Sequence, residues 1–302
     1  MRSSFTSDPT MTYQKERLLL GCDVDGTLIA RYEADDDTRR AANTALEALT
    51  GEIAHRRWLR GSTDSFYFGT VTGNTLATHA TLETDNLSFG WAVGFMQFIS
   101  GSVGTEIKVR DAETAKFEPV KSWFDTANWD PCKIREVLLG ATALGISMQP
   151  DAAQTQFKVG MHAKTTLSHT AYTEQVRTLL SKHDIRANPI YSSGLFLDIL
   201  PMQANGEPVD KGAALVHAAH VLAERDGLDN LPSLMFAGDS ENDWSGLLAA
   251  VDSGGHGIVP GNARADFKDH VRGTFGDDVY IAGSHFAAGV MEGLEHFVPR
   301  KV

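Results

Sequence analysis

The segment LLLGCDVDGTLIA, residues 18–30, constrains this chain more than any other stretch. Its apolar first half is typical of a buried strand, but two carboxylates, Asp23 and Asp25, stand where that strand should end. Burying a charge is costly unless other groups compensate it. Side chains two positions apart in a strand point to the same side, so this pair is predicted to face one common substrate.

The overall charge limits what that substrate can be. The chain has 302 residues, 42% of them hydrophobic, and a net charge of -12. Such an acidic chain is poorly suited to bind nucleic acid or anionic membranes through bulk charge. An anionic substrate would need local positive charge or a bound metal. The composition otherwise predicts a soluble protein of one or two domains, and we expect a monomer or a small homo-oligomer.

Two cysteines, Cys22 and Cys132, are too few for a disulfide framework, which is typical of a reducing compartment. We therefore expect a cytoplasmic protein, with Cys22 as a small buried strand residue rather than a nucleophile. No apolar segment of the sequence resembles a signal peptide or reaches membrane-spanning length. Residues 1–14 are predicted to form a disordered tail.

The order of strand and helix patterns predicts a core interrupted by a second domain. In residues 15–104 short apolar runs alternate with helical patterns, which indicates a parallel sheet covered on both faces. The same pattern returns in residues 202–302. Between them, residues 105–201 contain alternating runs such as TEIKVRD and FKVGMHAK, which predict half-exposed strands. We expect a doubly wound α/β core with an inserted α+β domain.

Four polar segments follow the predicted core strands or begin a helix. They are DVDGT at 23–27, TVTGN at 70–74, DKG at 210–212 and GDSEND at 238–243. Ligands of a doubly wound sheet bind beyond the carboxyl ends of the strands, so all four segments are predicted to converge on one crevice. Each alone is compatible with an ordinary turn, whereas their order and spacing together are hard to produce by chance.

This set resembles the four motifs of the haloacid dehalogenase-like (HAD) phosphohydrolases, and the inserted domain resembles the C2 type of cap in that family. The segments ISGSVGTEI, FKVGMH, YSSG, LDILP and HFAAGVMEGLEHF are further similar to the sucrose-phosphate phosphatase group. The resemblance covers residues 17–298. It implies an HAD-like fold in which the cap closes over the crevice and sets substrate specificity.

The chemistry of phosphoryl transfer gives the motif residues their expected roles. Asp23 would attack phosphorus and form an aspartyl-phosphate, while Asp25 would protonate the leaving oxygen and later activate water. Lys211 would hold the phosphoryl group as a point charge. Hydrogen bonds to the phosphoryl oxygens are expected from the Thr72 hydroxyl and the Gly73 amide. Asn242 is expected to position either the phosphate or a metal-bound water.

Four acids in one crevice would repel one another and raise some of their pKa values. We therefore expect a hard divalent cation with oxygen ligands, Mg²⁺. The resemblance implies that Asp23 and Asp239 bind it through their carboxylates and Asp25 through its backbone carbonyl. Asp243 is either a direct ligand or a residue that holds the ligands in place, and the sequence leaves this open.

Substrate choice is expected to lie with the cap. The alternation in FKVGMHAK assigns one strand face to Lys158, Gly160, His162 and Lys164. A polar face of this kind suits a sugar, although it is also typical of a solvated sheet surface. Further candidates for substrate contacts are Asn74, Glu106 and Asp198.

The chain departs from the sucrose-phosphate phosphatase pattern in three places. Asn74 stands where the group usually has Arg, Leu195 and Phe196 stand where charged residues are typical, and QANGEPVDKG is longer than usual. All three lie where substrate or cap contacts are expected, and none touches the expected phosphoryl chemistry.

The first expectation is thus a Mg²⁺-dependent phosphatase that hydrolyses sucrose 6-phosphate through an aspartyl-phosphate, with a small phosphorylated sugar as its partner. Another sugar phosphate or a glycosyl-phosphoglycerate is the alternative. A phosphomutase would hand the same phosphoryl group to another hydroxyl. A phospho-accepting signalling domain also carries an Asp at a strand end, but the large insertion and Asp25 argue against it, because Asp25 speeds loss of the phosphate. The complete acid set argues against an inactive sugar-binding protein.

Overall fold

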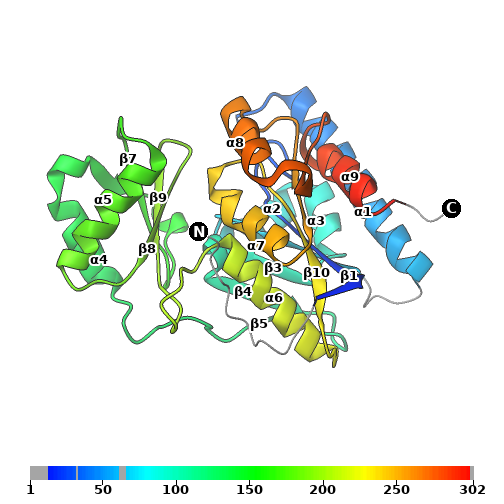
Figure 1. Cartoon of the computed structure of the whole chain (residues 1–302), viewed down its shortest axis with the longest axis horizontal. Coiled ribbons are helices and arrows are strands. Elements are labelled where there is room, and N and C mark those ends of the chain that lie inside the picture. The colour runs from blue at the N-terminus through cyan, green and yellow to red at the C-terminus, as the bar shows by residue number, and fades with distance from the viewer. Residues whose placement is uncertain (1–12, 32, 61–65, 300–302) are drawn as a thin grey trace.

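The computed structural model describes residues 13–31, 33–60 and 66–299. In this part of the chain the strands form two sheets that lie in separate regions of the molecule (Figure 1). The larger sheet has the strand order β12-β11-β10-β1-β2-β3-β4-β5, and the smaller sheet has the order β6-β7-β9-β8. The larger sheet is the core in which the predicted motif residues lie.

The central strands of the core sheet are parallel. β1 pairs with β10 on one side and with β2 on the other, and β11, β12 and β3 extend the parallel order. β4 and β5 are antiparallel additions beyond β3. The strands are β1 (Tyr13–Cys22), β2 (Phe66–Val71), β3 (Phe98–Gly101), β4 (Glu106–Arg110), β5 (Phe117–Pro119), β10 (Leu231–Ala237), β11 (His256–Val259) and β12 (Val279–Ile281).

Helices cover both faces of the core sheet, as its continuous apolar strands require. On β1, Leu18 and Leu20 pack with α1, α3 and α9, whereas Leu19 packs with α6 and α7 on the opposite face. Figure 1 shows α1 and α9 side by side, away from α6 and α7. The helices of the core are α1 (Asp36–Arg60), α2 (Leu76–Asp85), α3 (Leu87–Val93), α6 (Lys211–Arg225), α7 (Trp244–Asp252), α8 (Ala265–Phe275) and α9 (Phe286–Phe297).

The smaller sheet is antiparallel throughout and has helices on one face. Val159 and Met161 of β7 pack against Tyr172 and Val176 of α5, together with α4. The elements are α4 (Pro131–Gly140), β6 (Ile146–Met148), β7 (Val159–Ala163), α5 (His169–Lys182), β8 (Asn188–Ser192) and β9 (Phe196–Leu200). Residues of the other face, among them Lys158 and Asp198, line a cavity shared with the core.

Two predicted boundaries need correction. Residues 106–110 and 117–119 pair with the core sheet, so the segment predicted to be inserted from residue 105 begins with two core strands. The sequence of β4 alternates because its burial alternates near the edge of the core sheet, not because it lies in the smaller one. Tyr13 and Gln14, predicted to lie in the tail, pair with Leu231 and Pro232. Residues 1–12 of that tail lie outside the described residues.

The start of α6 is fixed by its cap and by a close helix contact. Asp210 precedes the helix, and its carboxylate accepts a hydrogen bond of 2.9 Å from the backbone amide of Ala213. A β-carbon on Gly212 would lie 2.2 Å from the carbonyl oxygen of Ser245, so only glycine allows α6 and α7 to approach this closely. These two features hold Lys211 in the interior. None of the helices in the described ranges combines the length and apolar character needed to cross a membrane.

Candidate active site

The four predicted motifs meet at the carboxyl end of the core sheet. Asp23 directly follows β1, Thr72 directly follows β2, and Asp239 follows β10 after one glycine. Lys211 opens α6, and its side chain reaches the same place. The parallel order of β2, β1 and β10 brings these groups together, because the carboxyl ends of neighbouring parallel strands lie at one edge.

Lys211 is fully buried between two aspartates. Its Nζ lies 2.7 Å from Oδ1 of Asp23 and 2.6 Å from Oδ1 of Asp243. Burial lowers the pKa of Lys211, but the two carboxylates more than offset this, so the net change is upward. The lysine is therefore a permanent ammonium group, held next to Asp23.

Three buried carboxylates form a compact cluster. One oxygen from each of Asp23, Asp239 and Asp243 lies within 4.8 Å of the others. Burial is the main reason that the pKa of Asp23 is well above its ordinary value, and the neighbouring acids add to it while Lys211 opposes it. Burial and Asp243 likewise raise the pKa of Asp239 to about 6, although Arg31 Nη2 lies 2.9 Å from its Oδ2. When ionised, the three carboxylates carry three negative charges against the two positive charges of Lys211 and Arg31.

Gly26 allows Asp239 to approach the first motif. Its backbone φ of +88° is a conformation that glycine adopts readily. A β-carbon at this position would lie 2.4 Å from Oδ2 of Asp239, so any larger residue would displace that carboxylate. The Thr27 hydroxyl also faces Oδ1 of Asp239, at 3.4 Å.

Asp243 holds the last motif in shape. Its Oδ2 accepts hydrogen bonds of 3.0 Å from the backbone amides of Asp239 and Ser240, and its Oδ1 is bound to Lys211. Both carboxylate oxygens are thus engaged by this chain's own donors, and the side chain is fully buried. Of the two roles that the sequence left open, this geometry favours holding the ligands in place.

Asp25 is held by the loop after β2. The Asn74 Nδ2 group donates a hydrogen bond to Oδ2 of Asp25. The backbone amide of Asn74 donates to the Thr72 hydroxyl oxygen at 3.2 Å, which leaves the hydroxyl proton of Thr72 available to another acceptor. Asn242 lies close by, because its Nδ2 would be 3.9 Å from a β-carbon on Gly73, and its Oδ1 accepts from Ser240.

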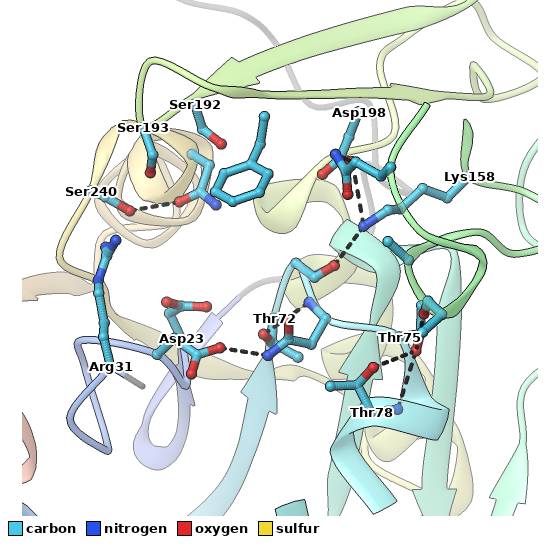
Figure 2. A pocket seen from close by; sticks show the side chains of 18 of the residues that line it. Asp23, Arg31, Thr72, Thr75, Thr78, Lys158, Ser192, Ser193, Asp198 and Ser240 are labelled. Atoms are coloured by element: carbon cyan, nitrogen blue, oxygen red, sulfur yellow. Dashed lines mark hydrogen bonds and ion pairs between the residues drawn. The ribbon is translucent and has the colours of Figure 1, made fainter. Parts of the chain in front are cut away.

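A cavity of about 320 Å³ opens between these loops and the smaller sheet (Figure 2). In Figure 2, Asp23, Arg31 and Thr72 lie on the core side, while Ser192, Ser193 and Asp198 face them from the smaller sheet. Other polar groups at the cavity wall are Asp25, Asn74, Thr75, Thr78, Gln149, Lys158, Ser240 and Asn242. This wall offers many hydrogen-bonding groups, and Pro150, Ala152, Ala153 and Phe196 add apolar surface to it.

The structure divides the predicted substrate residues into two groups. Asn74, Lys158 and Asp198 line the cavity. His162, Lys164 and Glu106 are outside the set of described residues that line it.

Each residue outside the cavity has another environment. The His162 ring packs on Phe196 at 5.7 Å between centroids, and Lys164 is exposed. Gly160, on the same strand face, is covered by Gln149, whose Oε1 would lie 3.0 Å from a β-carbon at this position. Glu106 lies in core strand β4, where its carboxylate oxygen Oε2 accepts hydrogen bonds from the Leu76 amide and the Ser102 hydroxyl. The expectation that Glu106 belongs to the inserted domain is wrong, because β4 pairs with core strand β3, while contact of Glu106 with substrate stays a prediction.

Sequence reasoning missed several side chains at the cavity. Arg31 follows the first motif closely, and its positive charge among so many acids was a usable signal. Ser192 and Ser193 stand in the YSSG segment, but nothing in the residues themselves marked them as cavity residues. Phe196 was noticed only as a departure from a pattern, yet its side chain lines the cavity and is 40% exposed.

Comparison with known proteins places this arrangement in a family. Residues 16–298 match the sucrose-6F-phosphate phosphohydrolase family. The chain belongs to this family. The match spans both sheets, so the resemblance to the sucrose-phosphate phosphatase group is confirmed.

The sequence identities to individual relatives are low. A mannosylfructose-phosphate phosphatase from Agrobacterium fabrum is 30% identical over 206 residues, covering 66% of this chain and 72% of that protein. Sucrose-phosphatase 1 from Nicotiana tabacum is 27% identical over 202 residues, covering 65% of this chain and 43% of that protein. The chain spans about half the length of two of the curated relatives that it matches.

A solved relative has the same fold. The sucrose-phosphatase of Synechocystis, in complex with sucrose and phosphate, superimposes with a TM-score of 0.67 and 24% identity, covering 94% of this chain and 98% of that chain. The predicted HAD-like core with an additional cap-type domain is thereby confirmed.

Proposed function

We propose that this chain is a phosphatase that hydrolyses a sugar phosphate through an aspartyl-phosphate on Asp23. The observation that carries the proposal is the meeting of Asp23, Asp25 and Lys211 beside a polar cavity that is shared with the smaller sheet. Membership of the sucrose-6F-phosphate phosphohydrolase family supports the same reaction.

The reaction would have two steps. In the first, a carboxylate oxygen of Asp23 attacks phosphorus and the bond from phosphorus to the sugar oxygen breaks, while Asp25 gives its proton to that oxygen. In the second, water attacks the aspartyl-phosphate, Asp25 takes a proton from the water, and phosphate leaves with Asp23 restored. Asn74 orients the Asp25 carboxylate for both transfers through its hydrogen bond.

Charge on the phosphoryl oxygens would be met by groups already in position. Lys211 lies against Asp23 and supplies a buried positive charge. The Thr72 hydroxyl, whose oxygen accepts from the Asn74 amide, retains a proton to donate to a phosphoryl oxygen. The loop at Gly73 and the side chain of Asn242 line the same cavity. Fixed donors of this kind are most effective where charge develops.

The acid cluster fits a divalent cation. Asp23 and Asp239 offer carboxylate oxygens within one 4.8 Å group, and the three carboxylates of that group outnumber the cations beside them, Lys211 and Arg31. All-oxygen ligands suit Mg²⁺, with Asp25 contributing its backbone carbonyl and Asp243 supporting the loop. When bound, the cation would neutralise phosphoryl charge and orient the phosphate against Asp23.

The substrate is proposed to be a disaccharide phosphate, with sucrose 6-phosphate first. The family description supports it, and so does the hydrogen-bonding wall formed by Asp198, Gln149 and the serines of β8. Mannosylfructose phosphate is the second candidate, because the relative at 30% identity acts on that compound by its name. Polar groups of the wall would bind the hydroxyls of the sugar, and Phe196 offers a flat apolar surface to a sugar ring.

Phosphate release tests the proposal directly. Purified protein with Mg²⁺ is assayed against sucrose 6-phosphate, mannosylfructose phosphate and glucose 6-phosphate, with and without a chelator. We expect release that needs Mg²⁺ and is fastest with one of the disaccharide phosphates. Transfer of the phosphoryl group to a second sugar hydroxyl without release would indicate a phosphomutase. A stable phosphoprotein with no turnover would indicate a signalling domain instead.

A further inference from the structure

Lys158 joins the smaller sheet to the phosphate-binding loop of the core. It immediately precedes β7, and its side chain is only 4% exposed. Its Nζ donates a hydrogen bond of 2.8 Å to the backbone carbonyl of Gly73 and lies 3.4 Å from Oδ1 of Asp198 (Figure 2). A second link lies beside it, because the Thr75 hydroxyl donates to the carbonyl of Ala152 at 3.2 Å.

This lysine has its partners within the protein. A buried ammonium group needs compensating charge and acceptors, and Asp198 supplies the charge from the smaller sheet while Gly73 supplies the acceptor from the core. A hydrogen bond from a charged donor is stronger than one between neutral groups. The contact therefore fixes the orientation of the peptide unit between Gly73 and Asn74.

The fixed peptide bears on the groups that the proposed reaction uses. The amide at its other end, that of Asn74, donates to the Thr72 hydroxyl oxygen at 3.2 Å. The side chain of the same Asn74 donates to Asp25. A chain of contacts thus runs from Asp198 through Lys158 and the Gly73–Asn74 peptide to Thr72 and Asp25.

We propose that Lys158 is a positioning residue that fastens the smaller sheet to the phosphate-binding loop and so aligns Thr72 and Asp25. This rests on the proposed phosphatase function. It replaces the expectation that Lys158 acts as a sugar contact. A sugar contact would matter only for substrates that carry the sugar, whereas a residue that aligns the phosphate-binding loop matters for every phosphate ester.

The test compares two esters in four proteins. Wild-type protein, Lys158→Met and Lys158→Arg are assayed with sucrose 6-phosphate and with p-nitrophenyl phosphate, which lacks the sugar. Lys133→Met is the matched control, because Lys133 is exposed on α4 and is absent from the described residues that line the cavity. Lys158→Met should lower kcat for both esters by a similar factor of about tenfold or more. Lys158→Arg, which keeps the charge and donors, should recover part of the loss, and Lys133→Met should match wild type.

Hydrogen exchange supplies a reading that does not depend on activity. Amides of residues 72–76 should exchange faster in Lys158→Met than in wild type, with unchanged protection in the central strands β1 and β10. If wild-type protein releases no phosphate from any ester, the proposed function fails, while this exchange result still decides whether the link exists.

Several outcomes would overturn the inference. A loss confined to sucrose 6-phosphate would make Lys158 a sugar contact. Equal kinetics and equal exchange in Lys158→Met and wild type would remove the link altogether. If Lys158→Met does not fold, Lys158→Gln takes its place in both measurements with the same expected results. Failure of both variants to fold would assign Lys158 to the stability of the fold rather than to the loop.

Discussion

Asp239→Asn should stabilise the metal-free protein at neutral pH. Asp239 is 6% exposed, and its pKa is raised from the ordinary 3.8 to about 6, mainly by burial. At 1.36 kcal/mol per pKa unit, the ionised carboxylate costs the metal-free fold about 3 kcal/mol, and the attraction of Arg31 is already included in that shift. Asparagine has the same shape and no charge. We expect a gain of about 1–3 kcal/mol, reduced because the new amide faces the Arg31 guanidinium.

The gain should depend on pH in a defined direction. Because the folded-state pKa of Asp239 lies above that of the unfolded chain, the folded protein binds this proton more tightly between pH 3.8 and about 6. The contribution of Asp239 to the unfolding free energy is therefore fully present at low pH and is lost as the pH rises through about 6. Wild type and Asp239→Asn should have similar melting temperatures near pH 3.5, below the unfolded-state pKa. In chelator at pH 7.5 the variant should melt about 2–6 °C higher.

Mg²⁺ should reverse this order. A cation that binds the ionised carboxylate stabilises the folded wild type, and more strongly at pH 7.5 than at pH 5, because the proton must leave first. Asp239→Asn should lose most of that stabilisation. Thermal melts at both pH values, with chelator and with Mg²⁺, measure the effect, and Asp269→Asn on the exposed face of α8 is the control. A variant that melts lower than wild type in chelator at pH 7.5, or that keeps the full Mg²⁺ effect, would refute the reasoning.

Three further substitutions test separate parts of the site. Asp23→Asn should abolish phosphate release but keep the fold, because the two side chains have the same shape, and turnover near the wild-type rate would rule out Asp23 as the nucleophile. Lys211→Met leaves Asp23 and Asp243 without their buried cation, so denaturant unfolding should show a loss of about 3–5 kcal/mol at pH 7.5 that shrinks at pH 5; an equal loss at both pH values would contradict the ion pairs. Phe196→Ala should raise KM for a disaccharide phosphate and spare p-nitrophenyl phosphate, whereas equal effects would deny it a sugar contact.

The core of the site could be predicted because chain order and sheet order are linked. Apolar strands that alternate with helices give a parallel sheet, and its strands end at a common edge. Asp23, Thr72 and Asp239 therefore had to lie near one another once their strands were assigned. Lys211 lies at the start of a helix rather than at the end of a strand. Its place in the site is predicted by the resemblance to a known family and not by the periodicity of apolar residues.

The edge of the core sheet could not be predicted in the same way. A half-exposed edge strand and a strand of an open cap sheet have the same alternation of polar and apolar residues. The alternation in β4 therefore predicts a strand of the inserted domain and places Glu106 among its substrate contacts, whereas β4 lies in the core sheet. Nothing local to the sequence marks the hydrogen bonds from Leu76 and Ser102 that Glu106 accepts, since they depend on how the loops after β2 and β3 meet.

The polar face of β7 shows the limit of strand periodicity for locating a binding surface. Alternation correctly separates Val159 and Met161, which pack on α5, from the face that carries Lys158 and His162. It does not say what covers that face. Gln149 donates to the carbonyl of Met161 across the sheet, and the partner of Lys158 is a backbone carbonyl 85 residues earlier in the chain.

Contacts with backbone carbonyls explain why the cap residues were harder to assign than the acids. A cluster of carboxylates can be predicted from the sequence, because few arrangements other than a cation site or an ion pair make several buried acids tolerable. A lysine that binds a carbonyl leaves no such mark, since every residue has a carbonyl. The residues around Lys158 and Lys211 do not by themselves indicate that either lysine is buried. Both are nevertheless buried next to an aspartate. What separates them is the second partner, which is Asp243 for Lys211 and the Gly73 carbonyl for Lys158. One lysine therefore meets the acid cluster itself, and the other meets the loop beside it.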